Sequence, residues 1–116
     1  MTGMADALKN IKFKLNGDPY YSPQFNRGGN AGTFTIQVFQ LAGGGVALDC
    51  DIEHKNSEDT SWTVAVSFAT MSTVALHSKD ATALKEQIRL KYVVSGSAAT
   101  AAVNFNVLAP QWRPYA

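Results

Sequence analysis

Apolar side chains recur at every second position along most of this chain, and this pattern restricts the fold more than any other feature. Successive side chains of a β-strand point to opposite faces, so the alternation predicts strands with one dry face and one wet face. Residues 73–77, with Val74 and Leu76, are a short candidate strand. Six longer runs have their apolar positions at Ile11, Phe13 and Leu15; Phe34, Ile36 and Val38; Val46, Leu48, Cys50 and Ile52; Trp62, Val64, Val66 and Phe68; Ile88, Leu90, Tyr92 and Val94; and Val103, Phe105 and Val107.

Segments rich in Gly, Asn, Asp and Ser separate these runs. The three glycines at 43–45 predict a hairpin turn, because glycine reaches positive φ without a steric cost. Residues 80–87 fit either a short helix, capped by Ser78 or Asp80, or a loop before the next strand. Short strands with turn signals between them predict an all-β fold, an antiparallel β-sandwich or jelly roll of about seven to eight strands.

A chain of 116 residues fits one domain with its own hydrophobic core. We divide it into an N-terminal arm at 1–10, a β-sandwich domain at 11–109 and a C-terminal tail at 110–116. Pro110 and Pro114 are expected to end the last strand and to keep the tail extended.

Charge and cysteine content narrow the classes of partner. Lys and Arg number 10 and Asp and Glu number 9, for a net charge of +1. Nucleic-acid-binding proteins usually carry a clustered basic excess, so we expect no direct nucleic-acid partner. We recognise no signal peptide and no transmembrane run, and therefore expect synthesis in a cytoplasm and no membrane contact. A single cysteine cannot form an internal disulfide.

The candidate reactive groups do not form a recognisable catalytic pattern. Cys50 alternates in step with core positions, which predicts a small buried side chain and not a nucleophile. His54 and His77 are too few for a typical three-ligand zinc site unless carboxylates or Cys50 join them. We expect no catalytic residue, no cofactor and no metal.

Two polar segments each allow both a functional and a purely structural interpretation. Asp49, Asp51 and Glu53 share one strand face and are either ligands for Ca²⁺ or a solvent-facing row of carboxylates. The run Glu-His-Lys-Asn-Ser-Glu-Asp-Thr-Ser-Trp at 53–62 is expected to be a polar hairpin loop that leads into a strand starting with a core Trp62. An acid–base role for its histidine would need a nucleophile and an orienting group, which the sequence does not supply.

Aromatic and arginine side chains near both ends of the domain are the candidate partner-binding residues. Such side chains either cover an open sheet edge or anchor an intermolecular contact, and we leave both interpretations open. The predicted set is Tyr20, Tyr21, Phe25, Arg27, Trp112, Arg113 and Tyr115.

The strand at 34–41, the polar run at 53–62 and the ending Val-Leu-Ala-Pro-Gln-Trp-Arg-Pro-Tyr-Ala at 107–116 together resemble a known class. They are similar to the small β-sandwich or jelly-roll structural proteins of tailed bacteriophage virions, of the capsid decoration or cement type. Tail and fibre components share the same build. The resemblance implies a protein without catalytic residues that self-associates, often as trimers, on a shell of major capsid protein.

Three functional hypotheses follow. The first is a non-enzymatic virion structural protein, made in the host cytoplasm, that stabilises the phage head as a homo-oligomer bound to capsid subunits. The alternative is a carbohydrate-binding module that stacks sugars on Tyr20, Tyr21 and Trp112 and uses Asp49 and Asp51 for hydroxyls or Ca²⁺. The third, a small cupin-like metal oxygenase, would need a cluster of histidines on facing strands.

Overall fold

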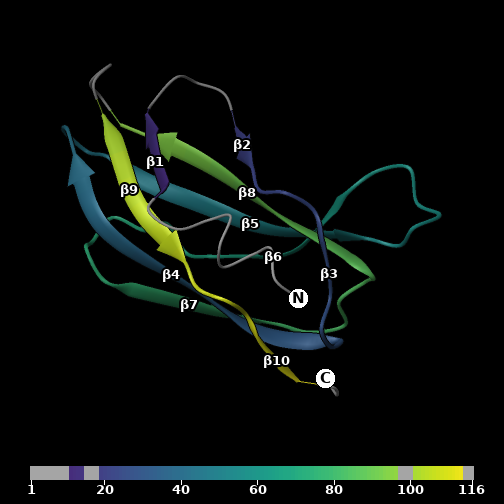
Figure 1. Ribbon diagram of the computed structural model, residues 1–116. Coiled ribbons are helices and arrows are strands. Elements are labelled where there is room, and N and C mark those ends of the chain that lie inside the picture. The colour runs from purple at the N-terminus through teal and green to yellow at the C-terminus, as the bar shows by residue number, and fades with distance from the viewer. Residues whose placement is uncertain (1–10, 15–18, 97–100, 114–116) are drawn as a thin grey trace.

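The computed structural model of this protein describes residues 11–14, 19–96 and 101–113 (Figure 1). These residues form strands and loops, and among them no helix is long and apolar enough to cross a membrane. Their ten strands are β1 (Ile11–Lys14), β2 (Tyr20–Tyr21), β3 (Phe25–Asn26), β4 (Ala31–Ala42), β5 (Ala47–Lys55), β6 (Thr63–Ser67), β7 (Leu76–Ala81), β8 (Gln87–Ser95), β9 (Ala102–Val107) and β10 (Gln111–Arg113).

The long strand β4 is the centre of the first sheet, which we call sheet A. β7 pairs along one edge of β4, and β9, which also pairs with β1, lies along the other. β10 continues the edge occupied by β9, because Gly32 and Thr33 each pair with β7 on one side and with β10 on the other. Residues 111–113 of the expected extended tail therefore form a strand of the sheet.

Sheet B is built around the antiparallel pair β5 and β8. β6 pairs with the other edge of β5, and the loop between these two strands extends beyond the end of the sandwich (Figure 1). β2 and β3 lie one after the other along the other edge of β8, because Lys91 and Gln87 pair with these strands on one side and with β5 on the other.

The order of the strands is that of a jelly roll. β2 with β3, and β9 with β10, each occupy one edge as two successive segments, so each pair counts as one interrupted strand. Numbered in this way along the chain, sheet A has the order 1-8-3-6 and sheet B the order 2-7-4-5. This interleaving of two antiparallel sheets is the eight-stranded jelly-roll arrangement. The predicted all-β antiparallel sandwich is confirmed.

The inner faces of the two sheets meet in one hydrophobic core made largely of the predicted dry positions. Leu48, Leu90 and Phe105 are fully buried, and the rings of Phe105 and Tyr92 lie 5.1 Å apart between their centroids. Full burial of a side chain of this size contributes about 1.5–3 kcal/mol relative to exposure. The other core positions that the alternation predicts, and that are buried, are Phe34, Ile36, Val38, Val46, Cys50, Ile52, Phe68, Ile88, Val94, Val103 and Val107.

The run at 62–68 differs from the prediction in its first half. We expected Trp62, Val64, Val66 and Phe68 to share the dry face. Phe68 is buried and Val66 packs against the core, but Val64 is 51% exposed and Trp62 is half-buried. The pairing of β6 with β5 shifts by one residue at Ala65, which forms a β-bulge. The extra residue turns the side chains that precede it to the outer face of sheet B.

One connection differs from expectation, and the structure decides between the two alternatives left open for another. The glycine segment at 43–45 is not a hairpin turn, because β4 lies in sheet A and β5 in sheet B, and it joins the sheets instead. Gly43 and Gly45 do take positive φ, at 107° and 62°. Residues 80–87 contain the end of β7, a loop and the start of β8, and not a helix. Ala83 in this loop has a φ of 53°, which a right-handed helix does not accommodate.

Candidate interaction surface

The outer face of sheet B brings together side chains from four separate segments. Residues opposite one another on paired antiparallel strands share a face, so Glu53 of β5 and Arg89 of β8 project together. Tyr21 of β2 is paired with Lys91, two residues beyond Arg89, and lies on the same face. The bulge in β6 places Trp62 there as well, within contact of Arg89.

Arg89 is at the centre of this arrangement. Its guanidinium carbon lies 4.1 Å from the centroid of the Tyr21 ring and 4.7 Å from that of the Trp62 ring. Its Nε donates a hydrogen bond of 2.7 Å to Oε1 of Glu53. The Nζ of Lys55 lies 5.3 Å from the centroid of the Trp62 ring. We call Tyr21, Glu53, Lys55, Trp62 and Arg89 the aromatic–arginine cluster.

The cluster is both fixed and accessible. Glu53 is only 8% exposed, and a carboxylate removed from water to this extent is costly unless it is paired. Arg89 supplies the pair, and its planar guanidinium also stacks on the aromatic rings. The Tyr21 ring remains 47% exposed. The side chains therefore hold one another in place while presenting an aromatic surface to solvent.

The neighbouring carboxylates of β5 are also engaged by groups of the same chain. Oδ1 of Asp51 accepts a hydrogen bond of 2.7 Å from the Ser67 hydroxyl, and Oδ1 of Asp49 accepts one of 2.6 Å from the Thr70 hydroxyl. Together with the Glu53–Arg89 pair, each of the three carboxylates has its own partner. Within the described residues, no group of three or more His, Cys, Asp or Glu side chains is placed to hold a metal ion.

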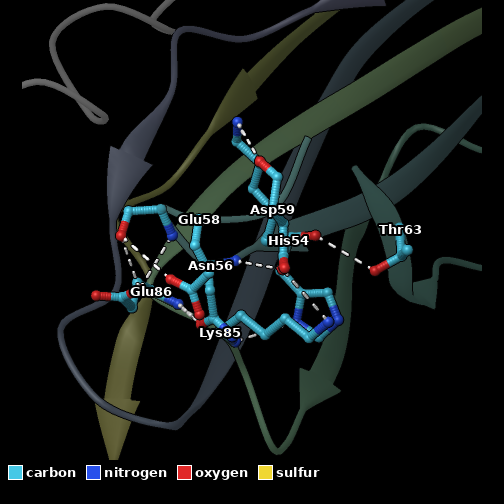
Figure 2. Close-up of polar contacts among 9 residues, drawn as sticks. His54, Asn56, Glu58, Asp59, Thr63, Lys85 and Glu86 are labelled. Carbon is cyan, nitrogen blue, oxygen red and sulfur yellow. Dashed lines mark hydrogen bonds and ion pairs between the residues drawn. The ribbon is translucent and has the colours of Figure 1, made fainter. Parts of the chain in front are cut away.

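Residues 56–62 of the polar run form the expected β5–β6 hairpin loop, whereas its first three residues end β5. A network of polar contacts ties the loop to the segment before β8 (Figure 2). The backbone N–H of Lys85 donates to Nδ1 of His54 at 3.1 Å, and its Nζ lies 3.7 Å from Oδ2 of Asp59. The backbone N–H of Ser57 donates to Oε1 of Glu86 at 3.0 Å. These contacts hold the loop beside the end of the sheet that carries Trp62 and Lys55.

His54 and Cys50, the side chains with reactive potential in this region, have structural roles. The Nδ1 of His54 accepts a hydrogen bond and so carries no proton. Partial burial and the positive charge of Lys85 lower the pKa of His54, against an opposing effect of Asp59. Burial, with smaller effects of Asp51 and Asp49, raises the pKa of the Cys50 thiol far above its usual range. A thiol in this state is a poor nucleophile at neutral pH.

A second aromatic group closes the far end of sheet A, where β10 meets the start of β4. The Trp112 ring packs edge-to-face against Phe34 at 5.7 Å and against Phe25 at 6.4 Å between centroids. Gly28 lies directly beneath it, and a Cβ at this position would come within 2.5 Å of the Trp112 ring. Trp112 and Phe25 thus complete the core at an edge, which is one of the two roles that we left open for them.

The predicted partner-binding residues therefore separate into different environments. Tyr21 belongs to the aromatic–arginine cluster, whereas Tyr20 is half-buried and packs against the core. Arg27 is exposed and its Nη1 donates to the backbone oxygen of Leu84. Arg113 is exposed and its Nη1 donates to the Thr33 hydroxyl at 2.9 Å. Tyr115 lies outside the described residues.

Of the five members of the cluster, sequence reasoning named only Tyr21 as an interaction residue and missed the other four, among them Arg89 and Trp62. The alternation already places Arg89 on the wet face of its strand, so pairing β8 with β5 opposite Glu53 would have identified it. No local signal marks the bulge that turns Trp62 outward.

Comparison with known proteins returned no match, neither to a protein-family model, nor to a curated protein, nor to a solved structure.

Proposed function

We propose that this protein is a non-enzymatic structural protein of a phage virion, a capsid decoration or cement protein that binds capsid subunits and further copies of itself. The aromatic–arginine cluster is the single observation that carries the proposal. Tyr, Trp and Arg are the residue types that most often dominate the binding energy of protein interfaces. Here they lie in contact with one another on the outer face of sheet B, with Tyr21 exposed and Trp62 and Arg89 half-buried.

Pre-organisation makes the cluster a suitable anchor. Ordering a flexible side chain on binding costs about 0.5–1.5 kcal/mol, which weakens an interface by the same amount. The guanidinium of Arg89 is already held by Glu53 and by two aromatic rings, so little of that cost remains. A partner that presents an apolar side chain beside an acceptor oxygen would contact the Tyr21 ring and the free N–H groups of the guanidinium together.

The carbohydrate-binding alternative has less support. It placed Tyr20, Tyr21 and Trp112 on one stacking platform, but Tyr20 packs toward the core and Trp112 closes the far end of sheet A. The two rings that do share a face, Tyr21 and Trp62, both lie against the Arg89 guanidinium, and Trp62 also has Lys55 above it. Of these two rings only Tyr21 is exposed, so the face offers a sugar one ring and not the predicted platform of three.

The test uses capsids of the phage that encodes this chain, prepared without it. Tyr21→Ala removes an exposed ring and leaves the Glu53–Arg89 pair in place, so the fold should be preserved. We expect the dissociation constant for capsids to rise at least about 30-fold, the effect of losing an interface hot spot. Ser72→Ala changes an exposed side chain in the segment between β6 and β7, outside the cluster, and is the control that should bind as the unchanged chain does.

Co-sedimentation with capsids over a range of protein concentrations measures both variants. Full occupancy by Tyr21→Ala at the concentrations that saturate the unchanged chain would rule out the cluster as the capsid contact. Saturable binding to a glycan array, lost in the same variant, would favour the carbohydrate-binding alternative instead.

A further inference from the structure

The outer face of sheet A carries exposed apolar side chains in adjacent rows. Leu76 of β7 is paired with Gln37 of β4, and both project to the face away from the core. In the next row, the backbone N–H of Leu108 donates to the backbone oxygen of Thr35, which extends the β9–β4 register by one residue and places Leu108 on this same face. Two apolar side chains from opposite edges of β4 therefore share one surface.

Two further apolar residues extend the patch. The N–H of Val38 donates to the oxygen of Ala75, so the pairing of β4 with the segment before β7 continues beyond Leu76. Phe39, at the point where the β4–β9 register shifts, and Val74, in the bend before β7, are the chain neighbours of Val38 and Ala75 at this end of the sheet. The four side chains are between 39% and 63% exposed. We call Phe39, Val74, Leu76 and Leu108 the sheet A patch.

Charged groups flank the patch in a defined arrangement. The neutral side chains of Gln37, Thr35, Ser78 and Asn106 fill its rows. In the row beyond, the hydroxyl of Thr33 donates to Asp80 at 2.7 Å and accepts from Arg113 at 2.9 Å. Asp80 lies on β7 and Arg113 on β10, so one negative and one positive charge stand on opposite sides of β4.

We propose that the sheet A patch binds the same surface of a second copy of this chain, about a two-fold axis parallel to β4. Such a rotation sets β7 of each copy over β9 and β10 of the other, at the same height along the strand. Asp80 of each copy then faces Arg113 of the other, and Leu76 and Leu108 are enclosed between the sheets. An isologous contact must be complementary to itself, and this one joins opposite charges and apolar groups. The inference rests on the proposed function for its self-association.

The face is large enough for a stable contact. A standard interface removes about 800 Å² per partner from water. The accessible surface of the chain is 6081 Å², so this amounts to roughly an eighth of it. The molecule extends 41 × 28 × 23 Å along its principal axes, so a broad face of the sandwich can supply this area.

Size-exclusion chromatography with light scattering on the full chain tests the interface. The unchanged protein should run as a dimer of 12.5 kDa chains. Leu76→Asp places a charge in the enclosed patch and should raise the dimer dissociation constant at least about 100-fold. Val64→Asp is the matched control, because Val64 is exposed to a similar degree but lies on sheet B.

A charge exchange tests the symmetry itself. Asp80→Arg and Arg113→Asp should each weaken the dimer about tenfold or more, and the double variant should recover it, because the two-fold axis pairs these positions between copies. Circular dichroism and thermal unfolding confirm that each variant is folded. If Leu76→Asp fails this check, the charge exchange alone decides.

A monomer at all concentrations, a trimer, or a dimer unaffected by both Leu76→Asp and the single charge variants would overturn the inference. The capsid-binding assay separates this result from the proposed function. A monomeric chain that still binds capsids through Tyr21 refutes the dimer and supports capsid binding. A two-fold dimer that does not bind capsids supports the interface and refutes the virion role.

Discussion

The two outer faces of the sandwich are both wet faces of alternating strands, but they are built with different chemistry. On sheet B the carboxylates of β5 are engaged within the face, as Glu53 is by Arg89 and Asp51 by Ser67. On sheet A the central rows are neutral and leave Leu76 and Val74 more than half exposed. A face whose charges are paired internally remains stable in water and can present one anchor. A face with exposed apolar side chains is stabilised when a partner covers it.

The largest expected effect concerns the contribution of β10 to the stability of sheet A. Trp112→Ala removes the ring that packs on Phe25 and Phe34 and should lower the free energy of unfolding by about 3 kcal/mol. Gln111→Ala, an exposed neighbour on the same strand, should change it by less than about 0.5 kcal/mol. Urea unfolding measures both. Equal stabilities would show that β10 is an appended tail and not part of the sheet.

The next effect concerns the paired charges of sheet B. Glu53→Ala leaves Arg89 without its carboxylate partner, and we expect a loss of about 2 kcal/mol in the free energy of unfolding. The corresponding change on sheet A, Thr35→Ala, breaks an exposed hydroxyl pair with Ser78 and should cost less than about 0.5 kcal/mol. Chemical denaturation measures the stability of both variants. Equal losses would contradict the proposed difference between the two faces.

The smallest effect is a pH dependence confined to the end of sheet B. The pKa of His54 is lowered in the folded chain, so the unfolded chain takes up a proton first as the pH falls. The contribution of His54 to stability is therefore complete above about pH 6.5, its ordinary pKa, and is lost as the pH falls through the folded-state pKa. Thermal unfolding between pH 7.5 and about pH 5 should show this decline, and His54→Gln should make it shallower. An unchanged slope would mean that burial and the positive charge of Lys85 do not favour the neutral ring in the folded chain.

Most of the core was predictable from the sequence, and the candidate surfaces were not. Leu48, Leu90 and Phe105 alternate with polar residues, and each is buried as expected. The aromatic–arginine cluster escaped prediction because Arg89 and Tyr21 are far apart in the chain and meet through strand pairing. For Trp112 the sequence left two roles open, and the contacts with residues of β3 and β4 decide that it covers an edge of the core.

The sequence by itself determined six of the ten described strands, β1, β4, β5, β6, β8 and β9, and, for most of them, which side faces the core. This follows because the period of two is a property of the extended backbone and needs no knowledge of the partner strand. Tertiary structure alone decided that the glycines at 43–45 join two sheets, that Ala65 forms a bulge, and that Trp62 therefore faces outward. Sheet membership and register depend on contacts between distant segments, and one extra residue in a paired strand reverses every side chain that precedes it.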